Sequence, residues 1–384
     1  MGCALALPVI ASVVAAASAD AELGLRAEGR TITLAPSGAP ADTRGALLAI
    51  PRAALRLDAA ALRLQASYAP RFWTSDVADR PSPLVTHEGE LRLETRHDRP
   101  WRAEAAASAA RGRTDPLADP LAALTQTGVT EATALDPVPF EALRGGLGGS
   151  LAFDLRTTLA GSGSAWRTGG IDAADRIRLP LQRGAGAEVS LAHLVSVRDT
   201  LRLRANASGT RTAAVGGDVD AASASASAGW RRRLTERLDG WLEAGAALWW
   251  EDRGDEPIRR GALPVGEAGL SYRRGDVGAE LAAQVAPYTD RLTGELDPMV
   301  RGRTTLRWQR TPRLTLASTA SGGTLLDGDT ALATWDARAR YAMRERLAFE
   351  VAVVGRWQRE QRNDLPSFME GGVVVALAWE SGAL

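Results

Sequence analysis

The chain has 384 residues, and its 46 basic and 46 acidic residues cancel to a formal net charge of zero. No basic surface that would bind nucleic acid is therefore expected, and nucleic acid is excluded as a predicted partner. The single cysteine, Cys3, lies close to the N-terminus, which excludes a disulfide framework or a cysteine-based zinc site. After the first residues the chain has no apolar run of about 18 residues, so no transmembrane helix is predicted.

The first predicted element is an export signal. Residues 1–16 are apolar or small, and Ala17, Ser18 and Ala19 before Asp20 match a small-residue cleavage site. We predict a signal peptide over residues 1–19, followed by a single mature domain over residues 20–384. No lysine or arginine precedes the apolar stretch, which departs from the usual signal, and an apolar cytosolic N-terminus is the alternative.

The rest of the chain repeats one pattern, in which about ten residues with alternate apolar positions are followed by a turn. Within residues 61–73, Leu62 and Leu64 fall on one face, and Arg63 and Gln65 fall on the other. A strand places successive side chains on opposite faces. Comparable strands are predicted at residues 84–96, 201–211, 300–310 and 331–343.

Eight tight, polar connections divide this pattern. They are predicted at residues 58–60, 97–100, 154–159, 198–201, 235–238, 274–276, 311–314 and 344–347. Longer stretches rich in Gly, Pro and Asp lie between them, so that short and long connections alternate strictly. Tight turns at the periplasmic rim and longer loops outside are typical of outer-membrane barrels.

The alternation also predicts the number of strands. Eight hairpins give sixteen strands, residues 370–379 add a C-terminal one, and closure with an even number requires a first strand, for which residues 30–35 are the candidate. We predict an all-β fold in which residues 20–384 form a single outer-membrane β-barrel, a transmembrane antiparallel up-and-down barrel of 18 strands, with 16 as the alternative. A barrel of this size leaves room for a water channel or a plug. The long loop at residues 111–141 is expected either to constrict this lumen or to cap its mouth.

Arginine side chains occupy the polar face of several predicted strands. An arginine that faces lipid at mid-depth costs about 2–4 kcal/mol, so these rows are expected to face the lumen. The predicted lumen-lining residues are Arg63, Arg71, Arg92, Arg202, Arg204, Arg301, Arg303, Arg307, Arg338 and Arg340. Two interpretations remain open, a conduit whose wall carries mixed charge and a salt-bridge lattice that closes the lumen.

Eleven tryptophans are present, and most lie near the ends of predicted strands. Indole rings favour the headgroup interface, where they form aromatic girdles. The predicted girdle residues are Trp73, Trp101, Trp230, Trp241, Trp249, Trp250, Trp308, Trp357 and Trp379. Packing of some of these rings in a core is the alternative.

Little in the sequence indicates catalysis, and we predict no catalytic residue, metal or cofactor. Ser190 and His193 are three positions apart, so a strand would point them to opposite faces, which makes them a poor nucleophile and base. A hydrolase at the rim that uses His87 or His193 is the less favoured alternative. The aspartates of the long loop at residues 115, 119 and 136 could hold a calcium ion, but Asp-Pro steps usually only form turns.

Over nearly the whole mature chain, the pattern resembles an outer-membrane β-barrel of the porin type. More narrowly, the stretch at Leu62 to Phe72, the strand and loop at Trp101 to Asp115 and the 18-strand layout resemble the integral barrels of bacterial polysaccharide-export systems. This resemblance implies a location in the cell outer membrane, contact with its lipid and lipopolysaccharide, and passage of a glycan delivered by a periplasmic export machine, without covalent chemistry. Passive passage of small solutes and a closed barrel that recruits a partner through its loops are the other hypotheses.

Overall fold

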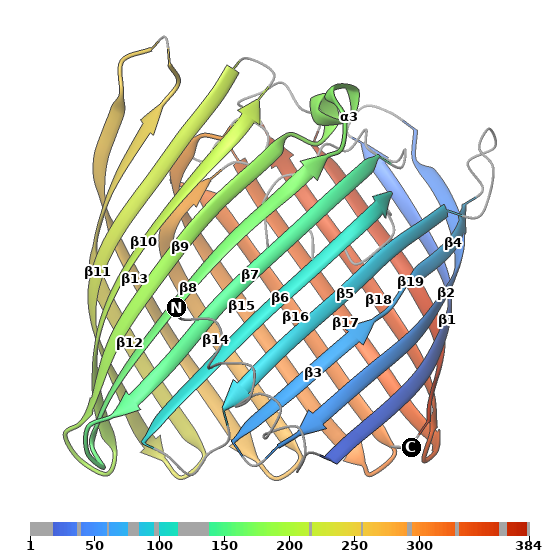
Figure 1. The fold of residues 1–384 in the computed structure, drawn as a ribbon, viewed down its shortest axis with the longest axis horizontal. Coiled ribbons are helices and arrows are strands. Elements are labelled where there is room, and N and C mark those ends of the chain that lie inside the picture. Colours follow the sequence, from blue (N-terminus) through green and yellow to red (C-terminus); the bar gives the residue numbers. More distant parts are fainter. Residues whose placement is uncertain are drawn as a thin grey trace, which may run out of the picture.

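The alternating segments form long antiparallel strands, tilted against the barrel axis, that join into one sheet (Figure 1). This computed structural model describes residues 18–36, 40–59, 61–75, 84–95, 100–113, 138–214, 217–254, 256–289, 294–326, 330–360 and 367–381. The predicted signal peptide lies almost entirely outside the described residues, and the first strand begins at Ser18.

The strands follow one another around the wall in chain order. The first half contains β1 (Ser18–Pro36), β2 (Asp42–Asp58), β3 (Leu62–Tyr68), β4 (Arg71–Ser75), β5 (Leu84–Thr95), β6 (Trp101–Arg113), β7 (Pro139–Ala152), β8 (Thr157–Gly170) and β9 (Leu181–Leu194). The second half contains β10 (Asp199–Ala214), β11 (Gly217–Thr235), β12 (Leu238–Asp252), β13 (Arg259–Arg274), β14 (Val277–Thr289), β15 (Leu296–Thr311), β16 (Leu314–Leu325), β17 (Thr330–Arg344), β18 (Leu347–Glu360) and β19 (Phe368–Glu380).

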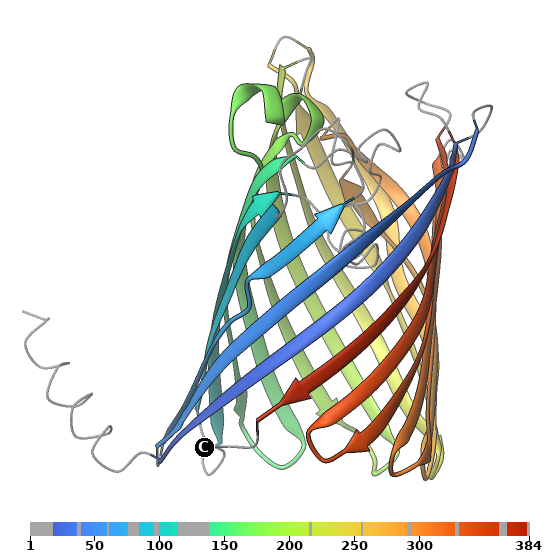
Figure 2. The same cartoon turned by 90° about the vertical axis from the view of Figure 1, so that its right-hand side faces the viewer.

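The sheet contains nineteen hydrogen-bonded segments, but β3 and β4 are two parts of a single strand. The barrel therefore has 18 strands, as predicted. Both pair with β2 on one side and β5 on the other, in one unbroken register. Ala69 and Pro70 separate them, and Pro70 has no N–H to donate to the ladder. β1 pairs with both β2 and β19, so the sheet closes on itself (Figure 2). The first strand is much longer than the predicted residues 30–35.

The eight predicted tight turns all join strands at one end of the barrel, and this end is the periplasmic rim of the fold. The longer connections lie at the other end, where helix α3 (Ala173–Arg178) links β8 to β9 (Figure 1). The strict alternation of lengths is wrong in one place, because only two residues join β10 to β11 at the loop end. Gly217, which begins β11, has φ of +128°, a conformation that glycine adopts without steric cost and that suits a sharp reversal.

Among the described residues, no helix is long and apolar enough to cross a membrane.

The two faces of the wall have opposite chemistry, and the polar face is the covered one. On β12, Ala247 and Glu251 are 0% and 1% exposed, whereas their neighbours Leu248 and Trp250 are 61% and 46% exposed. The same alternation runs around the sheet, with buried polar side chains such as Gln358 on one face and large exposed apolar ones on the other. The inner face of a closed barrel is concave, so its side chains crowd and cover one another. Apolar residues therefore point outward, as a barrel solvated by lipid requires.

Candidate transport lumen

All ten arginines predicted to line the lumen lie on the inner, polar face. The cross-strand ladder shows this directly, because it places Arg71 opposite the buried Thr86, Arg204 opposite the buried Ser190 and Arg338 opposite a buried alanine of β18. The others share the inner face of their strands: Arg63, Arg92, Arg202, Arg301, Arg303, Arg307 and Arg340. Most of these arginines belong to networks of ion pairs along the wall.

The longest network crosses the seam where the barrel closes. Arg338 on β17 lies 2.9 Å from Asp336 and 3.8 Å from Glu350 on β18. Glu350 accepts two hydrogen bonds from Arg26 on β1, at 3.0 and 3.2 Å, over the intervening strand β19. Arg26 also pairs with Glu28, which is 6% exposed. Charge-assisted hydrogen bonds of this kind are stronger than neutral ones, so the network joins β1 to β17 and β18 across the intervening β19.

A second network lies on β9, β10 and β12. The Arg204 guanidinium is 3.4 Å from a carboxylate oxygen of Glu188 and 3.4 Å from one of Glu243. Arg202 is 3.6 Å from the same Glu188. Here two arginines and two glutamates neutralise one another, which fits the hypothesis of an interior salt-bridge lattice.

A third group lies on β2 to β5. Arg63 is 2.7 Å from Asp58, and Arg71 is 2.9 Å from Glu88. Arg92 lies 3.9 Å from Glu94. These pairs also neutralise the wall locally, although the Arg92 side chain remains 49% exposed to the lumen.

Strand β15 differs from the rest of the wall. Its inner face carries Arg301, Arg303 and Arg307, and among the described residues none of the three forms an ion pair with a carboxylate. The ladder explains why, since the partners of Arg303 and Arg307 on β14 are Ala282 and Gly278. Their partners on β16 are a serine and an alanine. Arg301 instead lies 5.1 Å from the ring centroid of Tyr288. Glu280 on β14 lies on the same face opposite Thr305, between Arg303 and Arg307, but forms no ion pair with either. Strand β15 therefore carries a row of arginines that is not ion-paired, beside the neutralised networks.

The end of the loop between β14 and β15 is fastened to the inner wall near the mouth. Glu251 on β12 accepts a hydrogen bond from the Leu296 backbone N–H at 3.0 Å and pairs with Arg253 at 2.7 Å. Arg253 also pairs with Glu295, and this hydrogen bond contributes most to raising the pKa of Arg253 above its ordinary value. A Cβ added to Gly294 would lie 2.9 Å from side chains of β10 and β11. These contacts hold the start of β15 against the inner wall near the mouth. The predicted constriction or cap by the loop at residues 111–141 stays untested, because residues 114–137 lie outside the described residues.

The girdle prediction is wrong for three tryptophans, which face inward. Trp73 is 1% exposed and packs with Ala46, Leu48 and Leu84. Trp241 donates a hydrogen bond from Nε1 to Glu267, and Trp249 lies beside the inner residue Arg259. Their position near a strand end suggested the interface. The face, however, depends on the alternation along the strand, and each of these rings lies an even number of positions from a charged inner residue of its own strand.

Six of the predicted girdle tryptophans do face outward and are 38–46% exposed. They are Trp101, Trp230, Trp250, Trp308, Trp357 and Trp379. Trp250 and Trp357 lie toward the loop end of their strands, and the other four lie toward the tight turns. The outward rings thus occur toward both rims of the apolar band.

Three inner rings lie directly opposite a glycine of the next strand. Trp166 pairs with Gly184, Trp241 with Gly269 and Trp249 with Gly261. A Cβ on Gly184 would approach the Trp166 ring to 2.4 Å, so the indole occupies the space that a side chain would fill. The rings therefore lie close against the wall and turn an aromatic surface to the lumen.

The histidines considered for catalysis do not assemble with a nucleophile. His193 faces outward and lies 3.0 Å from the Thr157 hydroxyl, whereas Ser190 is buried on the inner face, as the spacing predicted. His87 lies on the outer face, 2.6 Å from the Tyr68 hydroxyl. His97 and the three loop aspartates lie outside the described residues. Within the described part of the chain, no group of three or more His, Cys, Asp or Glu is placed to hold a metal ion.

Sequence reasoning missed the lumen residues of the closing seam, above all Arg26, Glu28 and Glu350. Their signal was present, because Leu23 and Leu25 alternate with Glu22 and Arg26 in the same way as in later strands. The predicted first strand began too late to include them.

The chain spans an outer membrane, as its closed barrel and outward apolar face require. No protein-family model and no curated protein matches it. Among solved structures it is similar to OpdO of Pseudomonas aeruginosa, with 14% identity, 97% of this chain and 100% of that chain covered, and a TM-score of 0.48. It is also similar to the ferric-catecholate import receptor Fiu of E. coli K12 (8% identity, 93% and 81% covered, TM-score 0.49). A BenF-like porin of Pseudomonas fluorescens Pf-5 gives 9% identity, 96% and 99% coverage and a TM-score of 0.48.

Proposed function

We propose that this barrel is a passive outer-membrane channel that favours anions. The observation that carries the proposal is the inner face of β15, where Arg301, Arg303 and Arg307 have no carboxylate partner among the described residues. The chain as a whole has no net charge, so any charge preference arises from local arrangement. In a water-filled lumen with low-dielectric walls, a row of cations that form no ion pairs raises the local concentration of anions.

Ion selectivity in a planar bilayer tests this proposal. Under a salt gradient, the reversal potential is expected to show preference for chloride over potassium. Replacing Arg303 and Arg307 together by glutamine should reduce that preference. The matched control is the double variant Arg71→Gln with Glu88→Gln, which removes a neutralised inner pair and should leave the reversal potential unchanged.

The absence of ion current through folded protein would reject an open channel and favour the closed barrel that docks a partner. An unchanged reversal potential in the β15 variant would reject the anion preference and leave the channel itself intact.

As the finer form of this function, we propose passage of an acidic glycan. The flat rings of Trp166, Trp241 and Trp249 favour it, because sugar rings stack on aromatic faces through their C–H groups, while arginine binds carboxylates bidentately. A periplasmic polysaccharide-export machine that delivers the glycan to the tight-turn rim is the partner proposed with it.

Block of the channel current by oligosaccharides distinguishes this form from general anion passage. Uronic-acid oligomers should block at lower concentration than neutral oligomers of equal length. The Trp166→Ala variant should weaken that block with little effect on chloride current. Equal block by both oligomers would count against an acidic glycan.

A further inference from the structure

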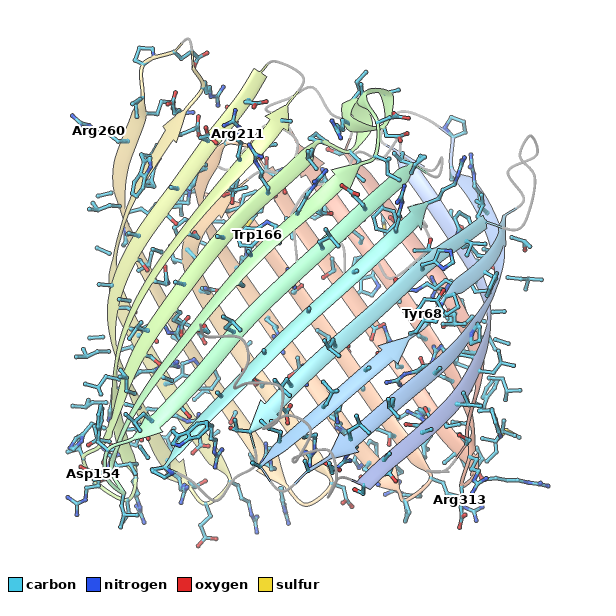
Figure 3. All side chains as sticks on the ribbon, viewed as in Figure 1. Tyr68, Asp154, Trp166, Arg211, Arg260 and Arg313 are labelled. Carbon is cyan, nitrogen blue, oxygen red and sulfur yellow. The ribbon has the colours of Figure 1, made fainter. Side chains whose placement is uncertain are left out.

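Three arginines lie side by side on the outer face, where apolar residues are the rule. Arg167 on β8 pairs directly with Arg183 on β9, which pairs directly with Arg211 on β10. Their chain neighbours Gln182 and Thr212 are buried on the inner face, at 4% and 0% exposure. The three arginines therefore point outward, and Figure 3 shows Arg211 toward the loop end of the wall.

The depth of this row matches the outer headgroup region. In the ladder, Arg183 lies ten residues along β9 from His193, and the outward positions between them are Ala185, Ala187, Val189 and Leu191. Ten residues of strand span about 33 Å, or roughly 24 Å along the axis of a barrel with strands tilted by about 45°, close to the height of the apolar band. The row thus lies at the outer edge of the hydrocarbon.

The row places three like charges directly opposite one another on adjacent strands. Like charges directly opposite on adjacent strands destabilise a sheet. Arg167 is 2.7 Å from Glu141, and Arg211 is 2.6 Å from Asp218 and 3.6 Å from Asp220, so the two flanking guanidinium groups are compensated. Arg183, between them, forms no ion pair with a described carboxylate and is exposed. The centre of the row is a cation that faces outward at headgroup depth.

The surface below the row suits straight acyl chains. Outward positions of β8 and β9 beneath the arginines are Gly163, Ala165, Ala185 and Ala187, which leave the wall smooth. On β10 the strip continues through Gly209 and Ala207, and on β7 the exposed Leu147 borders it opposite Gly163. A lipid whose phosphate reaches Arg183 could lay its chains along the strip.

We propose that Arg167, Arg183 and Arg211 form a binding site for the phosphorylated headgroup of an outer-leaflet glycolipid, with Arg183 at its centre. Arginine binds phosphate oxygens bidentately, and three guanidinium groups in one row complement a diphosphorylated sugar headgroup. The lipid phosphate would compensate Arg183, the arginine of the row that forms no ion pair with a described carboxylate. This site lies on the outer face, away from the lumen, so its test does not depend on the proposed channel function.

Binding of purified lipopolysaccharide to the detergent-solubilised barrel, counted by native mass spectrometry and titrated to an apparent Kd, tests the site. Arg183→Glu should weaken binding by roughly tenfold or more, because it replaces a charge-assisted hydrogen-bond donor with a repelling charge. The matched control is Arg260→Glu, an outward arginine near the same rim that lies opposite Trp250 instead of between two arginines. It should leave the Kd within about twofold, since the deciding feature is the row. Heat-modifiable gel migration verifies that each variant is folded.

Two further probes separate the phosphate from the rest of the lipid. Dephosphorylated lipopolysaccharide should bind the unaltered barrel as weakly as intact lipopolysaccharide binds the Arg183→Glu variant. Inorganic phosphate should not displace the lipid at equimolar concentration. Unchanged binding by folded Arg183→Glu, equal loss in Arg260→Glu, full binding of dephosphorylated lipid, or displacement by free phosphate would each overturn the proposal.

Discussion

Replacement of Gly355 by alanine should destabilise the barrel although the added group is a single methyl. Gly355 on β18 lies directly opposite Trp335 on β17, on the outer face. A Cβ at this position would lie 2.0 Å from two carbons of the indole ring and 2.5 Å from its Nε1, distances that real contacts do not reach. The ring must therefore leave its place on the strand.

The expected cost is about 1–3 kcal/mol, the usual range for overpacking a fitted site. The chain supplies a matched control, because Gly371 on β19 pairs directly with Gly355 on the same face. A Cβ there meets nothing within 4 Å. Gly371→Ala should be neutral or stabilising by roughly 0.5–1 kcal/mol, since alanine loses less backbone freedom than glycine on folding.

Urea unfolding of the lipid-reconstituted barrel, followed by tryptophan fluorescence and checked for reversibility, gives the two free energies of unfolding. In the Trp335→Ala background, Gly355→Ala should lose most of its cost, because the clashing ring is gone. If Gly355→Ala and Gly371→Ala have the same effect, or if the cost persists without the ring, the steric explanation is refuted.

Three other predictions concern the rims and the faces of the wall. Glu251→Gln should cost about 1.5–3 kcal/mol of unfolding free energy through weakened charge-assisted bonds at the mouth, and should increase current noise; a quiet, equally stable variant would contradict the proposed fastening. In the tight turn after β7, the backbone N–H of Arg156 is the main cause that lowers the pKa of Asp154. Because its pKa is lowered in the folded state, this carboxylate stabilises the fold at pH values above its unfolded pKa, and the contribution is lost as pH falls through the folded pKa. Asp154→Ala should therefore flatten the acid side of a plot of melting temperature against pH. An unaltered acid side would count against this assignment. Lipids with brominated acyl chains quench the fluorescence of tryptophans that face lipid. The quenched share of the barrel's tryptophan fluorescence should fall after Trp230→Phe and should not fall after Trp249→Phe. The reverse order would contradict the assigned faces.

Much of the lumen could be predicted because its signal is local. A strand alternates faces with a period of two, and an arginine in lipid is costly, so Arg202, Arg204 and Arg303 could be assigned to the inner face from their own strands. The same reasoning could have placed the three inward tryptophans correctly, since Trp73 lies two positions from Arg71 and therefore on the same face of its strand. Their ion-pair partners were not predictable, because the spacing within a strand does not state which residue of the next strand lies opposite.

The sequence by itself determined the alternation, the tight turns and the number of strands, since each depends on neighbours along the chain. Only the tertiary structure decided which cations are neutralised, because this depends on register and closure. Arg26 meets Glu350 only because the first strand pairs with the last. Arg303 forms no ion pair with a described carboxylate because alanine and serine lie beside it in the ladder. Electrostatic energy falls off with distance in space, and in a closed sheet that distance is set by pairing between strands far apart in the chain.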